Sequence, residues 1–284
     1  MRIQNKLVLT VLSSTLAVAA ASAPALAGRG GSPQAIKSAI DANSVDAIQA
    51  ELERAEHLVC AGCTDMVVPL VDHLSYRVRQ AAAWWLARRG ASREVYVSML
   101  TRLSQGDSVK ARNAADVLGE FRAASSIPAL SAALSNPIFS GEARAAMAHA
   151  LGQIGRGDVA APLTQALADG DPLVKAASLK ALREVDGFHD GMAAAPLTKD
   201  ADAIVRAEAA TTIGMLHTKA GASTLVAALS DADPVVRKKA AWALGEIGAQ
   251  ASVAGPALAT AAANDPNPFV RSIAQIAISK LTQQ

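Results

Sequence analysis

The sequence predicts an all-α protein, an α-solenoid of stacked antiparallel helix pairs, on three observations. The 284 residues are 51% apolar but only 3% aromatic, and alanine carries most of the apolar fraction, which favours closely packed helices. Runs of β-branched residues bounded by turn signals are nearly absent, so no sheet is expected. A helical segment also returns at a nearly constant spacing. Its clearest copies are DPVVRKKAAWALGEIG (233–248), DPLVKAASLKALREV (171–185), DADAIVRAEAATTIGML (200–216) and NPFVRSIAQIAISKL (267–281).

Each copy carries the signals of an amphipathic helix with a defined start and end. In the first of these copies, Asp233 stands as an N-cap before Pro234 at the first helical position, and Gly248 ends the helix. Shorter apolar segments such as 159–168 and 222–230 precede the helices, so each unit is predicted to be two antiparallel helices. The apolar stripe at helical spacing is Val236, Ala240, Leu244 and Ile247. Further N-caps are predicted at Ser75, Asp107, Asp171, Asp202 and Asn267, and a further C-terminal glycine at Gly155.

The repeat has a period of about 31 residues. The copies align on a basic residue near each helix start and an aliphatic residue seven positions later. The aligned pairs are Arg79/Leu86, Ala111/Leu118, Arg144/Leu151, Lys175/Leu182, Arg206/Ile213, Arg237/Leu244 and Arg271/Ile278, with spacings of 32, 33, 31, 31, 31 and 34 residues. The second pair belongs to a weaker copy, where Lys110 and Arg112 flank the place of the basic residue. Such a period predicts a solenoid, in which each unit buries its apolar face by stacking on its neighbours.

An aspartate stands six positions before the basic residue in four of the units. A cation near a helix N-terminus faces the unfavourable end of the helix macrodipole, and an aspartate in the turn would offset that cost. We therefore predict a ladder in which each basic residue pairs with the aspartate of its own or an adjacent unit. Isolated surface pairs contribute only about 0–1 kcal/mol, so the ladder would set register more than stability. The ladder residues are Asp169, Lys175, Asp200, Arg206, Asp231, Arg237, Asp265 and Arg271.

The pattern of a unit resembles a known repeat. Residues 231–245 show the pattern, which is an aspartate, then V-[RK] with the basic residue six positions later, and then A-x-x-A-L-G. This pattern is similar to the short HEAT-like repeat of the phycobilisome-lyase type. The resemblance covers about residues 63–284, weakens at 91–122 and lacks the turn aspartate at 123–155. It implies a HEAT-like repeat domain of about seven repeats over 63–284, with residues 33–62 as an N-terminal capping helix pair.

The first 27 residues predict a secretory signal peptide. Arg2 and Lys6 precede an apolar stretch of 14 residues, too short to span a bilayer comfortably, and small residues follow up to Ala25 and Ala27. Cleavage after Ala27 would leave 28–32 as a flexible leader on an exported protein, periplasmic or secreted, without stable membrane insertion; an uncleaved anchor is the alternative. The remaining chain has 25 basic and 25 acidic residues. A net charge of zero does not suit nucleic-acid binding.

The resemblance implies a protein-binding scaffold more than an enzyme, because most HEAT-like solenoids are scaffolds. Bilin lyases of this type attach chromophores in the cytosol, which does not suit a signal peptide. Deoxyhypusine hydroxylases hold two irons with His-Glu dipeptides, but no histidine of this chain precedes a glutamate. The residues that follow the five histidines are Leu58, Leu74, Ala150, Asp190 and Thr218.

The only cysteines, Cys60 and Cys63, form a CAGC motif. In an oxidising compartment we interpret them as a local disulfide between the capping pair and the first full unit. A thioredoxin-like redox role is an alternative, although no predicted strand precedes the motif. A zinc site of His57, Cys60, Cys63 and His73 is another. Haem attachment is excluded, because Thr64 stands where the motif requires histidine.

The sequence contains no recognisable catalytic set. It lacks a Gly-x-Ser-x-Gly turn, a Walker loop and a GxGxxG segment. We therefore expect no cofactor and no resident metal, and the sequence favours a protein that is not an enzyme.

Comparison of the repeats with one another indicates a binding face. The position five residues after the basic residue varies too widely for a core, so we expect it to face solvent along the second helices, which line the concave side of a HEAT-like stack. It holds Trp84, Asp116, His149, Lys180, Thr211, Trp242 and Ile276.

Aromatic and basic residues cluster near the first of these positions. Tryptophan, tyrosine and arginine dominate interface hot spots, and the arginines around Trp84 would suit an acidic or aromatic peptide. Trp85 could instead fill the junction with the capping pair. The aromatic cluster is Tyr76, Trp84, Trp85 and Tyr96, beside Arg77, Arg79, Arg88 and Arg89; the predicted protein-binding residues of the concave face are Tyr76, Trp84, Arg88, His149, Lys180 and Trp242. The sequence thus predicts an exported scaffold that binds another protein or peptide, with a redox or metal-binding protein using Cys60 and Cys63 as the alternative.

Overall fold

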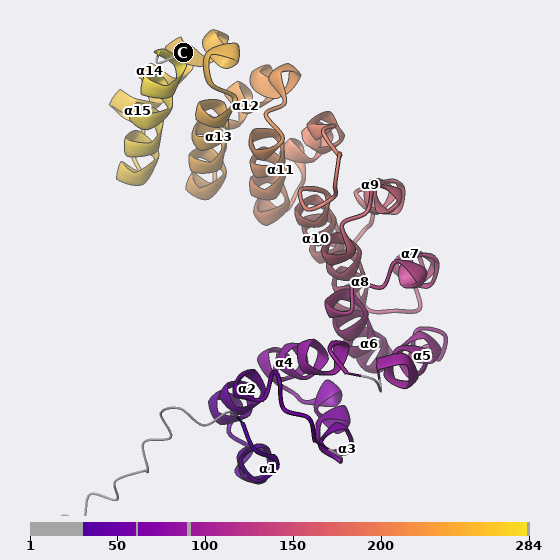
Figure 1. The fold of residues 1–284 in the computed structure, drawn as a ribbon. Coiled ribbons are helices and arrows are strands. Elements are labelled where there is room, and N and C mark those ends of the chain that lie inside the picture. Colours follow the sequence, from indigo (N-terminus) through magenta and orange to yellow (C-terminus); the bar gives the residue numbers. More distant parts are fainter. Residues whose placement is uncertain (1–30, 61, 90–91, 283–284) are drawn as a thin grey trace, which may run out of the picture. The chain divides into compact units, whose positions relative to one another are not determined.

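The computed structural model describes residues 31–60, 62–89 and 92–282 (Figure 1). Every regular element in these residues is a helix. The predicted signal peptide and most of the predicted leader lie outside the described residues.

The elements form eight successive helix pairs. The first members are α1 (Pro33–Asp41), α3 (Cys63–Val67) with η1 (Val68–Asp72), α5 (Ser92–Arg102), α7 (Ile127–Leu134), α9 (Ala160–Ala166), η4 (Gly191–Lys199), α12 (Ala222–Ala228) and α14 (Gly255–Asn264). The second members are α2 (Val45–Arg54), α4 (Tyr76–Ala87), α6 (Ser108–Glu120), α8 (Gly141–Ile154), α10 (Pro172–Leu182), α11 (Ala203–Met215), α13 (Pro234–Ile247) and α15 (Pro268–Thr282). Short 3₁₀ turns are η2 (Ala124–Ser126), η3 (Gly157–Val159), η5 (Lys219–Gly221) and η6 (Gly248–Ala254).

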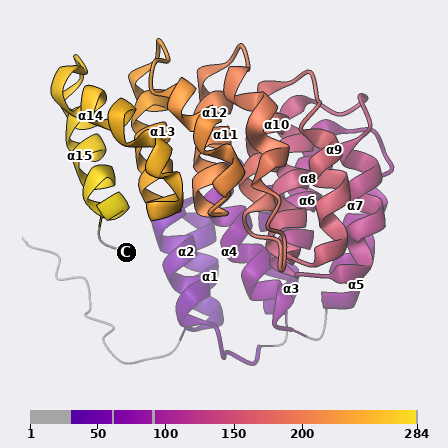
Figure 2. The same cartoon turned by 90° about the horizontal axis from the view of Figure 1, so that it is seen from above.

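The pairs stack into two layers. Each second helix packs against the second helix of the next pair, in the order α2, α4, α6, α8, α10, α11, α13 and α15, and each first helix packs on the second helix of its own pair (Figure 2). We call these rows the second-helix layer and the first-helix layer. The all-α solenoid predicted from the sequence is therefore confirmed.

The predicted capping signals explain most helix starts. The side chains of Asp107, Asp171, Asp202, Asp233 and Asn267 each accept a backbone N–H in the first turn of the following helix. Ser75 differs, because it precedes α4 without a side-chain capping bond. Instead the His73 imidazole accepts the Ser75 backbone N–H at 3.0 Å. One first helix also departs from the expected pattern, since η4 is a 3₁₀ segment that contains Pro196.

The core lies between the two layers and is continuous along the described stack. The predicted stripe of α13 is buried, with Val236, Ala240 and Leu244 inaccessible to solvent. Neighbouring second helices approach closely where small residues face one another. At Gly214, an added Cβ would lie 2.6 Å from Ala243 Cα on the next second helix. The glycine at this place of the repeat and the alanine that faces it thus permit close stacking between units.

Candidate functional site

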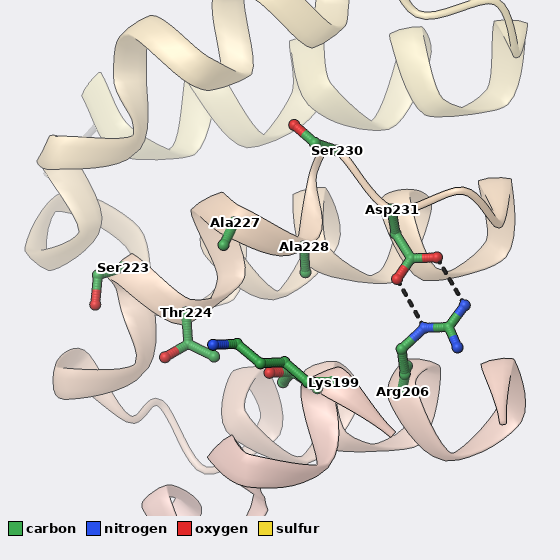
Figure 3. Close-up of a pocket in the computed structure, with 9 residues that line it drawn as sticks. Lys199, Arg206, Ser223, Thr224, Ala227, Ala228, Ser230 and Asp231 are labelled. Atoms are coloured by element: carbon green, nitrogen blue, oxygen red, sulfur yellow. Dashed lines mark hydrogen bonds and ion pairs between the residues drawn. The ribbon is translucent and has the colours of Figure 1, made fainter. Parts of the chain in front are cut away.

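The turn aspartates and the basic residues meet between units. Arg206 donates from Nε to Asp231 Oδ2 at 2.7 Å and from Nη2 to Oδ1 at 2.9 Å (Figure 3). Arg237 and Asp265 repeat this bidentate pair with the same two distances. Lys175 pairs with Asp200, and Arg144, outside the predicted set, pairs with Asp169. These four basic residues therefore each reach the aspartate of the following unit. Arg271, in the last unit, was also predicted to pair with an aspartate, but among the described residues it contacts only backbone carbonyls.

Each ladder arginine also fastens its own turn. Arg206 donates from Nη1 to the carbonyl oxygens of Asp200 and Ala201, at 2.9 and 3.0 Å. These carbonyl contacts and the aspartate offset the unfavourable position of a cation near a helix start. Arg271 donates to the carbonyls of Asp265 and Pro266 in the same way.

Three of the ladder aspartates, Asp200, Asp231 and Asp265, are stabilised in their charged form, since the pKa of each carboxyl is lowered. The hydrogen bond from Arg237 is the largest effect on Asp265 and lowers the pKa of its carboxyl below the ordinary value. Burial by itself would raise the pKa of Asp231, but the Arg206 hydrogen bond and the backbone N–H of Asp233 outweigh it, so this pKa is also lowered. These charges are engaged in holding units together, which indicates a structural role.

A cavity of about 460 Å³ lies beside one rung of the ladder, between η4 and α12. Arg206 and Asp231 line it, and Lys199 extends along it toward Thr224 (Figure 3). Its other lining residues are Thr198, Ser223, Ala227, Ala228 and Ser230. Its two ladder residues are already engaged with each other.

The predicted binding residues all lie on the second-helix layer, but not in one cluster. Tyr76 and Trp84 lie on α4, with Arg88 at its end, whereas His149, Lys180 and Trp242 lie on α8, α10 and α13. Tyr76 is 41% exposed, Arg88 and Lys180 are exposed, and Trp84, His149 and Trp242 are half-buried.

The expectation that the whole variable position faces solvent is wrong at two units. Asp116 is buried because Arg79 binds its carboxylate, and Thr211 is buried with its hydroxyl donating to the Ala207 carbonyl at 2.8 Å. A polar side chain can occupy this position without contacting water when a partner satisfies it.

Around Trp84 the second-helix layer contains a pocket of about 540 Å³, which we call the α4 pocket. Helix α4 contributes most of its lining, α2 contributes two residues and α6 contributes one. The pocket is lined by Gln49, Glu53, Arg77, Gln80, Ala81, Trp84 and Glu120. Of these, only Trp84 belongs to the predicted binding set. The i, i+4 spacing predicts that Gln49 and Glu53 share a face of α2 and that Gln80 and Trp84 share a face of α4. The spacing does not predict that these two faces line the same pocket.

The arginines near Trp84 already have partners. Arg88 stacks 4.3 Å from the Trp84 ring centroid and pairs with Glu56 at 3.5 Å. Arg77 binds Asp46 at 2.9 Å and the Gln49 side-chain oxygen at 2.7 and 3.0 Å.

Trp85 and Arg89 of the aromatic and basic cluster have structural roles. Trp85 is 1% exposed, and its indole N–H donates to the Ala55 carbonyl at 3.2 Å. Arg89 lies over the Trp85 ring and donates to the same carbonyl at 2.7 Å. Trp85 therefore fills the junction with the α1–α2 pair, as the alternative interpretation of this residue held.

The cysteines lie together, but the predicted zinc ligands do not. The Cα atoms of Cys60 and Cys63 are 5.4 Å apart, within the range of a disulfide. His73 is engaged elsewhere, since its Nε2 lies 3.1 Å from the Asn43 side-chain oxygen. Within the described part of the chain, no three His, Cys, Asp or Glu residues form a group that could hold a metal ion. No helix in that part is long and apolar enough to span a bilayer.

Comparisons with known proteins agree with this architecture. The family model described as HEAT repeats matches residues 97–183 and 193–279. An Escherichia coli protein, YibA, superposes with a TM-score of 0.55 and 17% identity, covering 88% of this chain and 92% of its own. An engineered protein superposes with a TM-score of 0.53 and 20% identity, covering 89% and 82%.

Two further comparisons add no functional information. Human deoxyhypusine hydroxylase, at a TM-score of 0.39 and 20% identity, covers 88% of this chain and 99% of its own, a likeness too weak to support a conclusion. No curated protein sequence matches the chain significantly.

Proposed function

The chain belongs to the HEAT-repeat family, and from this premise we propose that it is an exported scaffold that binds a segment of another protein along its second-helix layer. Repeats of this family typically bind proteins, because stacked units present an extended face whose residues vary from unit to unit. In this proposal the second-helix layer is the concave face, and the mature chain begins at Gly28 in the periplasm or outside the cell.

The observation that carries the proposal is the α4 pocket. A half-buried tryptophan in a solvent-accessible hollow offers apolar area to a partner without further unfolding, and such residues dominate binding energy at interfaces. Trp84 is fixed there by Arg88 on its ring. Tyr76, Gln80 and Trp84 lie at i, i+4 and i+8 on α4 and therefore share one helix face. On this face the Gln80 side chain, which lines the pocket, has an aromatic residue one turn before it and another one turn after it.

Export rests on residues 1–27 and on the pair Cys60 and Cys63. A hydrophobic leader with small residues at its end directs secretion, and cysteines at disulfide distance suit an oxidising compartment. The two features are independent of each other and agree.

The binding proposal can be tested without a known partner. A random dodecapeptide phage library would be selected on immobilised residues 28–284, and the dissociation constants of recovered peptides measured by fluorescence titration. We expect Trp84→Ala to weaken binding about 5- to 30-fold, the effect of a hot spot worth 1–2 kcal/mol.

The matched control is Tyr96→Ala, which removes a half-buried aromatic ring from α5 in the first-helix layer and should leave the dissociation constants unchanged. Unfolding curves exclude a trivial loss of structure: Trp84→Ala should cost about 1–2 kcal/mol, whereas truncation of the buried Trp85 should cost about 3–5 kcal/mol. Recovered peptides whose affinity is insensitive to both Trp84→Ala and Trp242→Ala would refute binding on this layer.

A further inference from the structure

We propose that the α4 pocket selects a basic segment of the partner and takes up one lysine or arginine side chain. This inference rests on the proposed function, and it names the chemistry of the partner. It replaces the acidic peptide that the arginine-rich sequence around Trp84 had suggested.

Two carboxylates of the pocket form no ion pair with any residue that the structure describes. Glu53 accepts a hydrogen bond from the Gln49 amide at 2.8 Å, and no ion pair among the described residues includes it. Glu120 accepts from the Gln80 amide at 3.0 Å and the Gln153 amide at 3.1 Å. Glu120 too forms no ion pair with any residue that the structure describes.

The hydrogen bonds at Glu120 leave one oxygen available. Both amides donate to Oε1, and no described residue donates to Oε2. Glu120 is half-buried, and its carboxylate is held in place by the two amide donors. A fixed carboxylate oxygen without a donor is a preorganised acceptor for an ammonium or guanidinium group.

The cation within the pocket does not neutralise these charges. Arg77 is bound to Asp46 outside the pocket and to the Gln49 oxygen. Glu53 and Glu120 are therefore the two charges of the lining that form no ion pair with the described part of the chain. The pKa of the Tyr76 phenol, one turn before Gln80 on α4, is raised mainly by burial; the charges of Asp116 and Glu120 raise it further, and Arg79 opposes them.

The pocket also fits the apolar part of a basic side chain. Lysine and arginine bury their methylene stems against apolar surface and keep the charged group at a polar site. Trp84 and Ala81 supply that surface in the α4 pocket, and the carboxylates stand on α2 and α6, either side of α4. An acidic side chain placed there would be repelled by the two carboxylates, which costs affinity and rejects such partners.

The test uses three capped decapeptides of one sequence in which the same four positions are lysine, glutamine or glutamate. Binding to residues 28–284 would be measured by isothermal titration. We expect the lysine peptide to bind most tightly and the glutamate peptide most weakly. Glu53→Gln and Glu120→Gln should each weaken the lysine peptide about 5- to 10-fold, the effect of one partly buried charge pair, and leave the glutamine peptide unchanged.

The matched control is Glu94→Gln, which removes an exposed carboxylate that also forms no ion pair with a described residue but lies on α5, outside the α4 pocket. It should not alter the affinity for any of the three peptides. If Glu94→Gln weakens binding of the lysine peptide as much as Glu120→Gln does, the effect comes from the net charge of the protein and the inference is overturned.

Two other results would also overturn it. If the glutamate peptide binds as tightly as the lysine peptide, and its binding needs Trp84, the charge assignment is wrong while the proposed function stands. If none of the three peptides binds, but library peptides without lysine or arginine bind through Trp84, the charge assignment is again wrong and the proposed function again stands. Failure of the library selection itself contradicts the proposed function, so the two failures are distinguishable.

Discussion

Arg79 and Asp116 form an ion pair that is buried on both sides, with Arg79 Nε 3.0 Å from Asp116 Oδ2. The unit that follows α4 lacks the turn aspartate of the repeat, so Arg79 cannot make the ladder contact that Arg206 and Arg237 make. It still fastens its own turn, donating from Nη1 to the His73 and Leu74 carbonyls at 3.0 Å. The charge of Arg79 is instead balanced by Asp116, a residue expected from the sequence to face solvent.

Removal of Asp116 should be costly. Burial is the main effect on its carboxyl and raises the pKa of Asp116 despite Arg79. Asp116→Ala would leave Arg79 buried and unpaired, so we expect a loss of about 3–5 kcal/mol in urea unfolding. Asp41→Ala breaks the exposed pair with Lys37 and should cost less than about 1 kcal/mol.

If Asp116→Ala does not fold, the combined change Arg79→Met and Asp116→Leu should restore a folded protein, because apolar replacement of both partners removes the unpaired charge. An Asp116→Ala variant as stable as Asp41→Ala would contradict this account of the pair.

Acid should weaken the ladder in a defined pH range. The folded-state pKa values of Asp200, Asp231 and Asp265 lie below the ordinary 3.8, so their stabilisation is complete above that value and is lost as the pH falls through the lower folded-state values. We expect the thermal midpoint to fall more steeply below pH 3.8 in the wild type than in Asp265→Asn, which has one such group fewer. Parallel curves for the two proteins in that range would argue against the pair with Arg237 as the cause.

Close stacking between units should make one glycine intolerant of a methyl group. At Gly214, a Cβ would lie 2.6 Å from both Cα and Cβ of Ala243, so Gly214→Ala must push α11 and α13 apart. We expect a loss of about 1–3 kcal/mol in thermal unfolding. Gly170 has no atom within 4 Å of an added Cβ, and Gly170→Ala should be neutral or slightly stabilising. Equal effects at the two positions would exclude overpacking as the reason.

Export can be checked on protein purified from its native host. N-terminal sequencing should begin at Gly28 of the mature chain, and Met1 retained in a membrane fraction would refute cleavage. Cys60 and Cys63 should resist alkylation until a reductant is added, because a disulfide leaves no free thiol. Alkylation of both cysteines in the untreated, denatured protein would refute the disulfide.

The repeat itself could be recognised from the sequence because its signals are local. An N-cap aspartate, a proline at the first helical position and an apolar stripe act within a few residues, and the same signals return about every 31 residues. Asp233, Pro234 and the stripe through Leu244 could therefore be placed on a helix, and the ladder could be predicted from the spacing of Asp231 and Arg237.

What the sequence by itself determined about this protein was the helix pairs, their stacking order and most of the ladder residues; Arg144 was missed. Only the tertiary structure decided which unit each arginine reaches and that Asp116 is buried while Trp84 is half-buried. It also brings Glu53 and Glu120 into one pocket, where neither forms an ion pair with a described residue. The reason is physical. Local signals fix a helix and its faces, but the charge balance of a surface depends on which side chains of neighbouring helices find each other, and near Trp84 the arginines are held by partners outside the pocket.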